Sequence, residues 1–237
     1  MAPDHSDVRL SIIIPVFNEA DNIANVHAGL RTKAHTPNRI FVVYDLDEDN
    51  TLPVVRQLQL SDPDLFLVKN TRGRGVLNAM KTGFDQVPSG PCLVVMGDLS
   101  DDLAQVDLMM EKYLQGFKIV CASRYMKGGR QEGGPFLKRT LSRLAGVSLN
   151  WFFGFPIHDV TNNFRLYDKA LLEGIDIESQ GGFELAMEVT VKAFKKGLPI
   201  CEVPAVWKDR TAGRSNFKLW KWLPHYLKWY LYAVLPR

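Results

Sequence analysis

Short apolar, β-branched runs alternate with helical segments over the first half of the chain. Runs of this kind form buried strands, and the segments between them have the length and pattern of helices. The alternation predicts an α/β domain built from βαβ units, with a mostly parallel sheet, helices on both faces and right-handed crossovers. We expect strands at residues 10–16, 39–44, 65–68, 92–96 and 117–122, and helices at 21–33, 51–60, 76–84 and 103–115.

The pattern changes after residue 122. Residues 123–135 are rich in Gly and Arg, and we expect this segment to be mobile without ligand because ordering Gly costs conformational entropy. Further helices are expected at 138–153 and 183–196, a strand at 199–207, and polar loops at 157–165 and 208–216. We therefore expect one α/β domain over residues 1–216, followed by an amphipathic, aromatic segment at 217–237.

Composition sets limits on the class of protein. The chain has 237 residues, 46% of them hydrophobic, which is enough for a substantial core. A net charge of +3 is too small to indicate a nucleic-acid partner. The three cysteines are far apart, lack metal-site spacing and read as reduced thiols, which favours the cytosolic side of a membrane. The first residues have no signal-peptide pattern, and no uninterrupted apolar run is long enough to span a bilayer.

Acidic residues follow two of the expected strands. Asp98, Asp101 and Asp102 come directly after the strand at 92–96, together with Ser100, and Asp45 follows the strand at 39–44. The carboxyl ends of parallel strands meet at the edge where open α/β sheets bind ligands. Oxygen ligands suit Mg²⁺ or Mn²⁺ carrying a diphosphate. The alternative is that these residues only cap the next helix.

Longer motifs carry a family resemblance. The supporting strings, in order along the chain, are IIIPVFNEADNI, VVYDLDEDNT, VVMGDLSDD, ASRYMKGG, LKRTLSRLAG, HDVTNNFRLYDKALL and VPAVWKDRTAGRSNFKL. Together they make the chain resemble family 2 inverting glycosyltransferases of the GT-A fold, and in particular polyprenyl-phosphate sugar synthases of the dolichol-phosphate mannose synthase type. The last three strings matter most, because general members of family 2 lack that set.

The resemblance implies roles for individual residues. The nucleotide pocket would be lined by Pro15, Phe17 and Glu19, with Asp45 reading the base and Arg74 close by. The divalent metal, Mg²⁺ or Mn²⁺, would be bound by Asp98 with help from Ser100. The acceptor phosphate would meet Arg124, Lys138, Arg139 and Ser142, while Asp159 would bind substrate or pack its own loop. The loop over the donor diphosphate would contribute Arg210 and Ser215, with Lys218 beyond. Asp98, Arg124 and Arg210 are the implied catalytic residues.

Three departures from the family pattern bear on metal affinity and donor identity. Met96 replaces the first carboxylate of the usual Asp-x-Asp. The Asp-Asp-Gly-Ser motif appears as YDLD at 44–47, and Thr-Ser-Gly-Phe-Arg appears as TNNFR at 161–165. One carboxylate fewer is compatible with Mg²⁺, which commonly keeps waters and uses few protein ligands. Asp101 or Asp102 could also compensate.

The implied reaction moves a hexose from a GDP- or UDP-linked sugar to a polyprenyl phosphate. A phosphate monoester has a second pKa of about 6, so it is ionised near neutral pH and needs no general base, unlike a hydroxyl. The site must instead neutralise the leaving diphosphate and position the acceptor phosphate. The alternatives are a family 2 transferase with a hydroxyl acceptor, or a non-catalytic subunit that only binds a nucleotide sugar.

The segment at 217–237 interleaves Trp and Tyr with Lys, which is typical of the membrane interface. We expect it to lie on the bilayer surface or to contact a membrane-anchoring partner, with a core helix as the alternative. Lysines make a membrane crossing costly. Pro224 is expected to interrupt any single long helix here.

Overall fold

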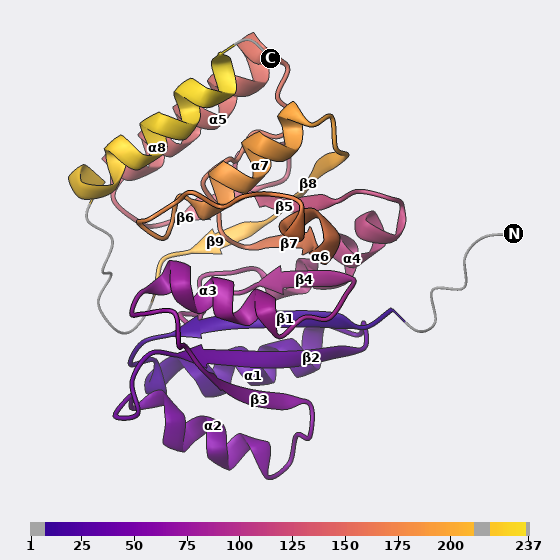
Figure 1. Cartoon of the computed structure of the whole chain (residues 1–237), viewed down its shortest axis with the longest axis vertical. Coiled ribbons are helices and arrows are strands. Elements are labelled where there is room, and N and C mark those ends of the chain that lie inside the picture. Colours follow the sequence, from indigo (N-terminus) through magenta and orange to yellow (C-terminus); the bar gives the residue numbers. More distant parts are fainter. Residues whose placement is uncertain (1–7, 211–218, 236–237) are drawn as a thin grey trace, which may run out of the picture.

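The computed structural model describes residues 8–210 and 219–235. Within this part, a seven-stranded sheet has the order β3-β2-β1-β4-β7-β5-β8 (Figure 1). Every neighbouring pair is parallel except those made by β7, which is antiparallel to both β4 and β5. The strands are β1 Leu10–Val16, β2 Asn38–Tyr44, β3 Leu65–Lys69, β4 Pro91–Val94, β5 Ile119–Ser123, β7 Arg165–Asp168 and β8 Ile200–Pro204. The mostly parallel α/β sheet expected from the sequence is confirmed.

Helices cover both faces of the sheet (Figure 1). The helices are α1 Ala20–Lys33, α2 Thr51–Gln59, α3 Val76–Asp85, α4 Val106–Leu114, α5 Phe136–Phe153, α6 Lys169–Glu173, α7 Leu185–Lys195 and α8 Leu219–Val234. The pleat divides each central strand between two cores, since successive side chains point to opposite faces. Ile12 and Ile14 pack with residues of α1, α2 and α4, whereas Ile13 packs with residues of α3, α5, α7 and α8. Both faces of β1 are therefore apolar, as expected for a central parallel strand.

β7 is the one strand of the seven-stranded sheet that the sequence did not predict. Its Arg165 made the segment look polar, yet this side chain is fully buried. The guanidinium donates to the carbonyl oxygens of Ala186 at 2.6 Å and Asp159 at 3.0 Å, which compensates its burial. Arg165, which looked typical of a polar loop, therefore lies in an inner strand of the sheet.

The Gly/Arg segment, for which no strand was expected, contains a short paired strand. Residues Arg130–Glu132 make strand β6, which pairs in parallel with β9, Val206–Lys208, in a small second sheet. The strand expected at 199–207 is consequently two strands, β8 and β9, in different sheets. Position 129 requires glycine because the backbone of Ser123 passes close to it. A Cβ at 129 would lie 2.2 Å from the carbonyl oxygen of Ser123. Its glycine content therefore reflects tight packing.

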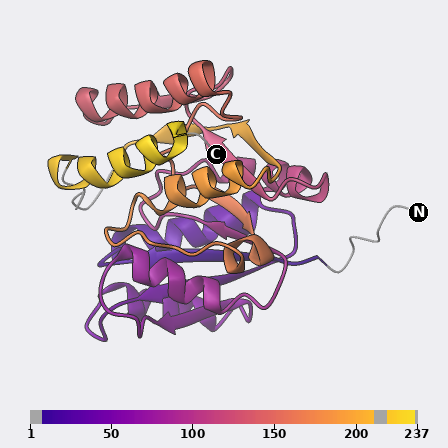
Figure 2. The ribbon, with the colours of Figure 1, turned by 45° about the horizontal axis from the view of Figure 1, so that its top comes forward.

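The C-terminal helix α8 packs against α5 and α7 at one end of the sheet (Figure 2). Pro224 lies inside α8, so the expected interruption is not found. Trp229 is only 2% exposed, and the ammonium of Lys192 lies 4.8 Å from its ring centroid. The hydroxyls of Ser148 on α5 and Tyr230 on α8 are hydrogen-bonded at 2.9 Å. Part of the aromatic segment thus belongs to the protein core.

None of the helices described here is both long enough and apolar enough to cross a bilayer.

Replacing Gly129 by alanine should destabilise the fold by about 1–3 kcal/mol, because the new methyl group collides with the Ser123 backbone. The matched control is Gly174→Ala, where the backbone is ordinary and the nearest atom lies 3.4 Å away, so stability should change little. Urea unfolding monitored by circular dichroism measures both. Equal stabilities for the two variants would contradict the close approach.

Candidate active site

The implied nucleotide-binding residues gather where the sheet order reverses. β1 lies between β2 and β4, so the loops after β1 and β4 leave the sheet side by side, at the point where open α/β sheets bind ligands. Gly97, after β4, packs against the loop after β1: a Cβ at this position would lie 3.3 Å from Val16 and 3.5 Å from Glu19. The absence of a side chain at 97 therefore lets the two loops meet.

The loop after β2 holds the turn after β1 in place. Asn18 has a φ of 56°, and its N–H donates to both carboxylate oxygens of Asp49, at 3.2 and 3.1 Å. The N–H of Glu19 donates to the Thr51 hydroxyl at 2.9 Å, and that of Ala20 to the Asn50 side chain at 3.2 Å. The sequence analysis missed this set, although the Asp-Asn-Thr run that precedes α2 is typical of helix-capping chemistry.

Asp45 anchors the loop that carries Arg74. One carboxylate oxygen accepts from the Asn70 side chain at 2.7 Å and the other from the N–H of Gly75 at 2.8 Å. Asp45 and Arg74 both line the large cavity described below, together with Pro15, Phe17 and Glu19. The five implied nucleotide-binding residues are thus brought together.

Asp98 faces a cationic group in this structure. One of its oxygens accepts from the Ser100 N–H at 3.1 Å, and the other accepts from the Arg210 guanidinium at 2.6 Å. The same guanidinium lies 3.7 Å from a carboxylate oxygen of Glu19. Burial raises the pKa of Glu19, the side chain of Asn22 and the charge of Arg210 oppose that rise, and Asp98 adds to it. Two carboxylates therefore converge on one positive charge.

The other two acidic residues after β4, Asp101 and Asp102, accept hydrogen bonds from backbone N–H groups. Asp101 accepts from the Met96 N–H at 2.7 Å, and burial raises its pKa to about 8. Asp102 accepts from the N–H of Val206 at 3.1 Å and so ties β9 to this loop. Neither the short 3₁₀ turn at Leu103–Gln105 nor α4 has a side-chain N-cap, so the capping alternative is not observed.

The donor set at Asp98 fits a cation that arrives with a diphosphate. Within residues 8–210 and 219–235, no three His, Cys, Asp or Glu side chains are grouped closely enough to hold a metal by themselves. Asp98 and Ser100 nevertheless offer oxygen ligands at the cavity, and Asp98 already accepts one positive group. Mg²⁺ often combines one or two carboxylates with phosphate and water oxygens. The residues present therefore fit such an ion.

A buried ion pair organises the other side of the site. Arg124 is 8% exposed and donates through Nε and Nη2 to the two oxygens of Asp159, at 2.7 and 2.9 Å. Asp159 is fully buried and also accepts the backbone N–H groups of Arg124, Thr161 and Asn162. Burial favours the neutral carboxyl, but the charge and hydrogen bonds of Arg124 outweigh this and hold the pKa of Asp159 below its usual value. Of the two roles expected for Asp159, substrate binding and packing of its own loop, the structure shows the packing of the loop.

Ser142 connects this ion pair to α5. Its hydroxyl accepts from Arg124 Nη2 at 3.1 Å and from the Tyr125 hydroxyl at 3.0 Å. The sequence analysis gave no role to Tyr125 or Thr161, which complete the network around Arg124, although both lie in the quoted motifs. Ser142 and Arg124 both line the cavity.

Lys138 and Arg139, expected as a pair, point to different places. Lys138 lines the cavity, whereas Arg139 does not, and its guanidinium lies 5.7 Å from the ring centroid of Phe136. On a helix, adjacent residues face directions about 100° apart, which allows Lys138 to reach the cavity while Arg139 stays outside it. Burial and then the charge of Arg124 lower the pKa of Lys138 to about 8.

One cavity of about 1420 Å³ joins the implied nucleotide-binding residues to Asp98, Arg124, Lys138 and Arg210. Its polar end contains Asp98, Ser100, Arg124, Lys138 and Arg210 beside the implied nucleotide pocket. Its other end is apolar and lies between α5, α7 and α8, with lining from Leu141, Leu144, Ala145, Met187, Leu223 and Tyr226. Ser215 and Lys218, implied on the loop over the donor, lie outside the described residues. The cavity exceeds the roughly 300–1,000 Å³ of ordinary small-molecule sites.

Replacing Asp159 by asparagine should destabilise the protein by roughly 3–5 kcal/mol, because the Arg124 charge is left buried without its partner. Because the pKa of Asp159 is lowered by folding, its stabilising contribution exists above the unfolded-state pKa and is lost as pH falls through the lower folded-state value. Chemical denaturation at a series of acidic pH values should show this loss in the wild type and not in Asp159→Asn. The control Asp85→Asn breaks the exposed pair with Arg72 and should cost less than about 1 kcal/mol.

Comparison with known proteins agrees with the architecture. Solved structures of glucosyl-3-phosphoglycerate synthase from Mycobacterium tuberculosis superpose with TM-scores of 0.69, for the complex with Mn²⁺, UDP and glucosyl-3-phosphoglycerate, and 0.68, for the complex with Mg²⁺ and UDP. Each alignment covers 98% of this chain and 82% of the other, with identities of 14% and 13%. At this identity the likeness concerns the fold alone, which is of the GT-A type.

Sequence relatives are more similar. The polyprenol monophosphomannose synthase of Mycolicibacterium smegmatis is 29% identical over 88% of this chain and 80% of its own length. The dolichol-phosphate mannosyltransferase of Pyrococcus furiosus is 28% identical over 94% of this chain, which spans 64% of that longer protein. The profile described as glycosyl transferase family 2 matches residues 11–176, and the chain therefore belongs to glycosyltransferase family 2.

Proposed function

We propose that the protein transfers a hexose, with inversion, from a nucleotide-diphosphate sugar to a polyprenyl phosphate. The observation that carries this proposal is the single cavity with a charged end and an apolar end. The apolar extension between α5 and α8 would not stabilise a bound hydrophilic acceptor such as a small hydroxyl compound. It would stabilise a bound isoprenoid chain, because burying the apolar surface of that chain is favourable. The names of the two sequence relatives support the same acceptor class and make mannose the first sugar to test.

The charged end suits attack by a phosphate. The acceptor's second pKa is about 6, so at neutral pH its oxygen is already a nucleophile for the anomeric carbon. Lys138 lies on the cavity wall, where Arg124 and Arg210 also contribute positive charge. Lys138 would hold the incoming phosphate, and Arg210 would neutralise the departing nucleoside diphosphate. Arg124, held by Asp159, would keep Ser142 and the start of α5 in position.

A divalent cation, Mg²⁺ or Mn²⁺, would be bound at Asp98 and Ser100 together with the donor diphosphate. When bound, it would supply charge neutralisation to the leaving group. In the ligand-free protein the Arg210 guanidinium lies against Asp98, so Arg210 would move toward the diphosphate when the donor enters. Asp45, with Phe17 and Glu19, would lie beside the nucleoside.

The test is a transfer assay with radiolabelled GDP-mannose, GDP-glucose, UDP-glucose and UDP-galactose, with Mn²⁺ and with or without a short-chain polyprenyl phosphate. Product that appears only with the lipid phosphate supports the proposal. Transfer to a hydroxyl acceptor, with none to the lipid phosphate, would indicate a different family 2 transferase. Donor binding without turnover on any acceptor would indicate a non-catalytic nucleotide-sugar-binding subunit.

Asp98→Asn should lower turnover by at least about a hundredfold, since the developing diphosphate charge loses its cation. Mn²⁺ binding in the presence of the nucleoside diphosphate, followed by electron paramagnetic resonance, should weaken in parallel. Asp102→Asn is the matched control, because an amide oxygen can still accept from the Val206 N–H. Wild-type activity and Mn²⁺ binding in Asp98→Asn would refute the role of Asp98.

Affinity for a short-chain polyprenyl phosphate should fall as pH rises from about 7 to about 9. The pKa of Lys138 is lowered to about 8, so its positive charge is lost over this range while the phosphate stays fully ionised. In Lys138→Arg the fall should disappear, because a guanidinium remains protonated throughout. Isothermal titration calorimetry measures the affinity, and identical pH profiles for the two proteins would exclude Lys138 as the titrating group.

A further inference from the structure

We propose that Asn163 binds a hydroxyl group of the donor hexose and thereby determines which sugar the protein accepts. The inference rests on the proposed function, because it assigns a residue to the sugar unit of that donor. In the proposed function, Asp98, Arg210 and Lys138 serve the two phosphates. The hexose carries no charge, so it must be recognised by neutral hydrogen-bonding groups in the space between them.

The sheet topology fixes where the hexose would lie. With inversion, the acceptor phosphate attacks the anomeric carbon from the side opposite the departing diphosphate, so the hexose lies between the two phosphates. The loop after β4 carries Asp98, and Arg124 directly follows β5. β7 lies between β4 and β5 and is antiparallel to both (Figure 1). The residues just before β7 therefore emerge between the loop of Asp98 and the loop of Arg124.

Strand register places Asn163 at this boundary. Arg165, the first residue of β7, pairs with the last residue of β4 and with the third residue of β5. Continued by two residues, these registers put Asn163 between Met96 and Ser123. Met96 and Asn163 are both half-buried and both line the cavity. The Asn163 side chain thus belongs to the stretch of cavity wall that the hexose would meet.

The Asn163 carboxamide is available to a ligand. Other Ser, Thr, Asn and Gln side chains that line the cavity are already hydrogen-bonded within the protein, namely Gln131, Ser142, Ser148, Thr161 and Asn162. Ser100 is the residue proposed for the cation. Across residues 8–210 and 219–235, the Asn163 side chain makes no hydrogen bond. A carboxamide both donates and accepts, which matches a sugar hydroxyl.

Hydrogen bonds hold the backbone on either side of Asn163. The Asn162 side chain donates to the Ala122 carbonyl oxygen at 3.0 Å and accepts from the Phe164 N–H at 3.3 Å. The N–H of Asn162 donates to Asp159 at 3.2 Å, and the N–H of Ala122 donates to the Phe164 carbonyl oxygen at 3.2 Å. A group on such a backbone loses little entropy when a ligand binds, which strengthens its contribution to affinity.

Both Asn163 and its neighbour Met96 are departures from the family pattern described above. Asn163 adds a side chain where the pattern has Gly, and Met96 replaces a carboxylate. The two changes together remove a negative charge and add a neutral polar group at adjacent positions on the cavity wall. A site that hydrogen-bonds a substrate hydroxyl discriminates against analogues that lack it. The sugar preference of this chain therefore depends on a side chain that the family pattern does not supply.

The experiment measures binding, so its result does not require transfer. Isothermal titration calorimetry with Mn²⁺ compares GDP-mannose, GDP-glucose, UDP-glucose and UDP-galactose with GDP and UDP alone. It then compares monodeoxy analogues of the sugar nucleotide that binds most tightly, each lacking one hydroxyl of the hexose. In the wild type, loss of one particular hydroxyl should weaken binding roughly three- to tenfold. In Asn163→Ala the same loss should have no effect, while affinity for the nucleoside diphosphate alone stays at the wild-type value.

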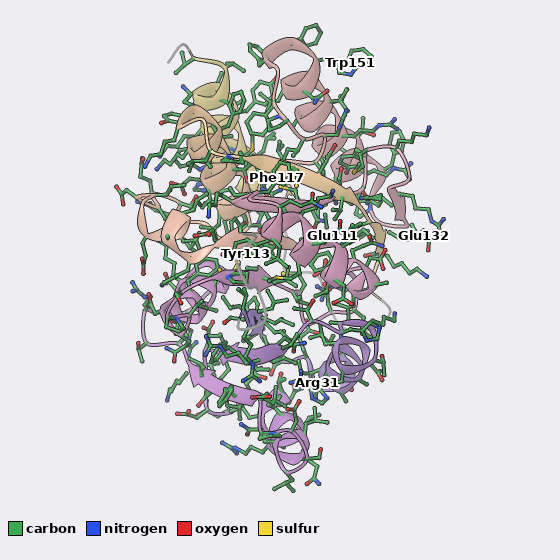
Figure 3. All side chains as sticks on the ribbon, turned by 90° about the vertical axis from the view of Figure 1, so that its right-hand side faces the viewer. Arg31, Glu111, Tyr113, Phe117, Glu132 and Trp151 are labelled. Atoms are coloured by element: carbon green, nitrogen blue, oxygen red, sulfur yellow. The ribbon has the colours of Figure 1, made fainter. Side chains whose placement is uncertain are left out.

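Two further variants separate recognition from folding. Asn163→Leu keeps the volume of the side chain but removes its polar atoms, so it should lose the same discrimination. The matched control Asn25→Ala removes an exposed carboxamide from α1, the helix that carries Arg31 in Figure 3, and should bind like the wild type. Because the Asn163 side chain makes no hydrogen bond to the described residues, Asn163→Ala should leave the melting temperature unchanged.

Three results would overturn the inference. The first is an equal effect of every hydroxyl in the wild type and in Asn163→Ala, and the second is an equal loss of affinity for the sugar nucleotide and the diphosphate alone in Asn163→Ala. The third is a wild type that binds none of the sugar nucleotides. Hydroxyl-dependent binding that requires Asn163, without transfer to any lipid phosphate, supports the inference and refutes the proposed function. Transfer to lipid phosphate with equal hydroxyl effects in both proteins does the opposite.

Discussion

The ion pair between Arg124 and Asp159 is the interaction on which the side of the cavity next to α5 depends. It joins the end of β5 to the loop before β7, and through Ser142 it also fixes the start of α5. Both partners are almost completely buried, so each charge is tolerable only because the other is present. The carboxylate also accepts three backbone N–H groups, which makes the loop geometry part of the same network.

The positive groups that line the cavity differ in their surroundings. Arg124 is held by Asp159, whereas Lys138 and Arg210 line the cavity outside that ion pair. These two differ in chemistry: an ammonium whose pKa is lowered to about 8 is sensitive to pH, whereas a guanidinium is not. The Arg210 guanidinium lies 2.6 Å from Asp98 and 3.7 Å from Glu19, so two carboxylates converge on its single positive charge.

The small sheet of β6 and β9 connects the two ends of the site. β6 follows the Arg124 segment, and β9 leads directly to Asp209 and Arg210. The Asp102 carboxylate holds β9 against the loop that carries Asp98. Backbone hydrogen bonds of β6 and β9 therefore connect the residues before Arg210 to the segment that follows Arg124.

Some failures of the sequence analysis have a common physical cause. Gly-rich character at 123–135 indicates backbone freedom, but the same residue type is needed where backbones touch, as at Gly129. Arg165 looked like a loop residue because its hydrogen-bond acceptors, Ala186 and Asp159, lie elsewhere in the chain. Pro224 was expected to break a helix that tertiary packing preserves.

The sequence by itself determined the parallel strands, the acidic groups at their carboxyl ends and the family, because these depend on local apolar runs and on motifs of adjacent residues. Only the tertiary structure decided that Arg124 is held by Asp159, that Lys138 enters the cavity while Arg139 does not, and that Trp229 is core while Trp151 is exposed. A helical pattern fixes which side chains share a face. Which face meets the core and which meets water or lipid is set by the elements packed beside it.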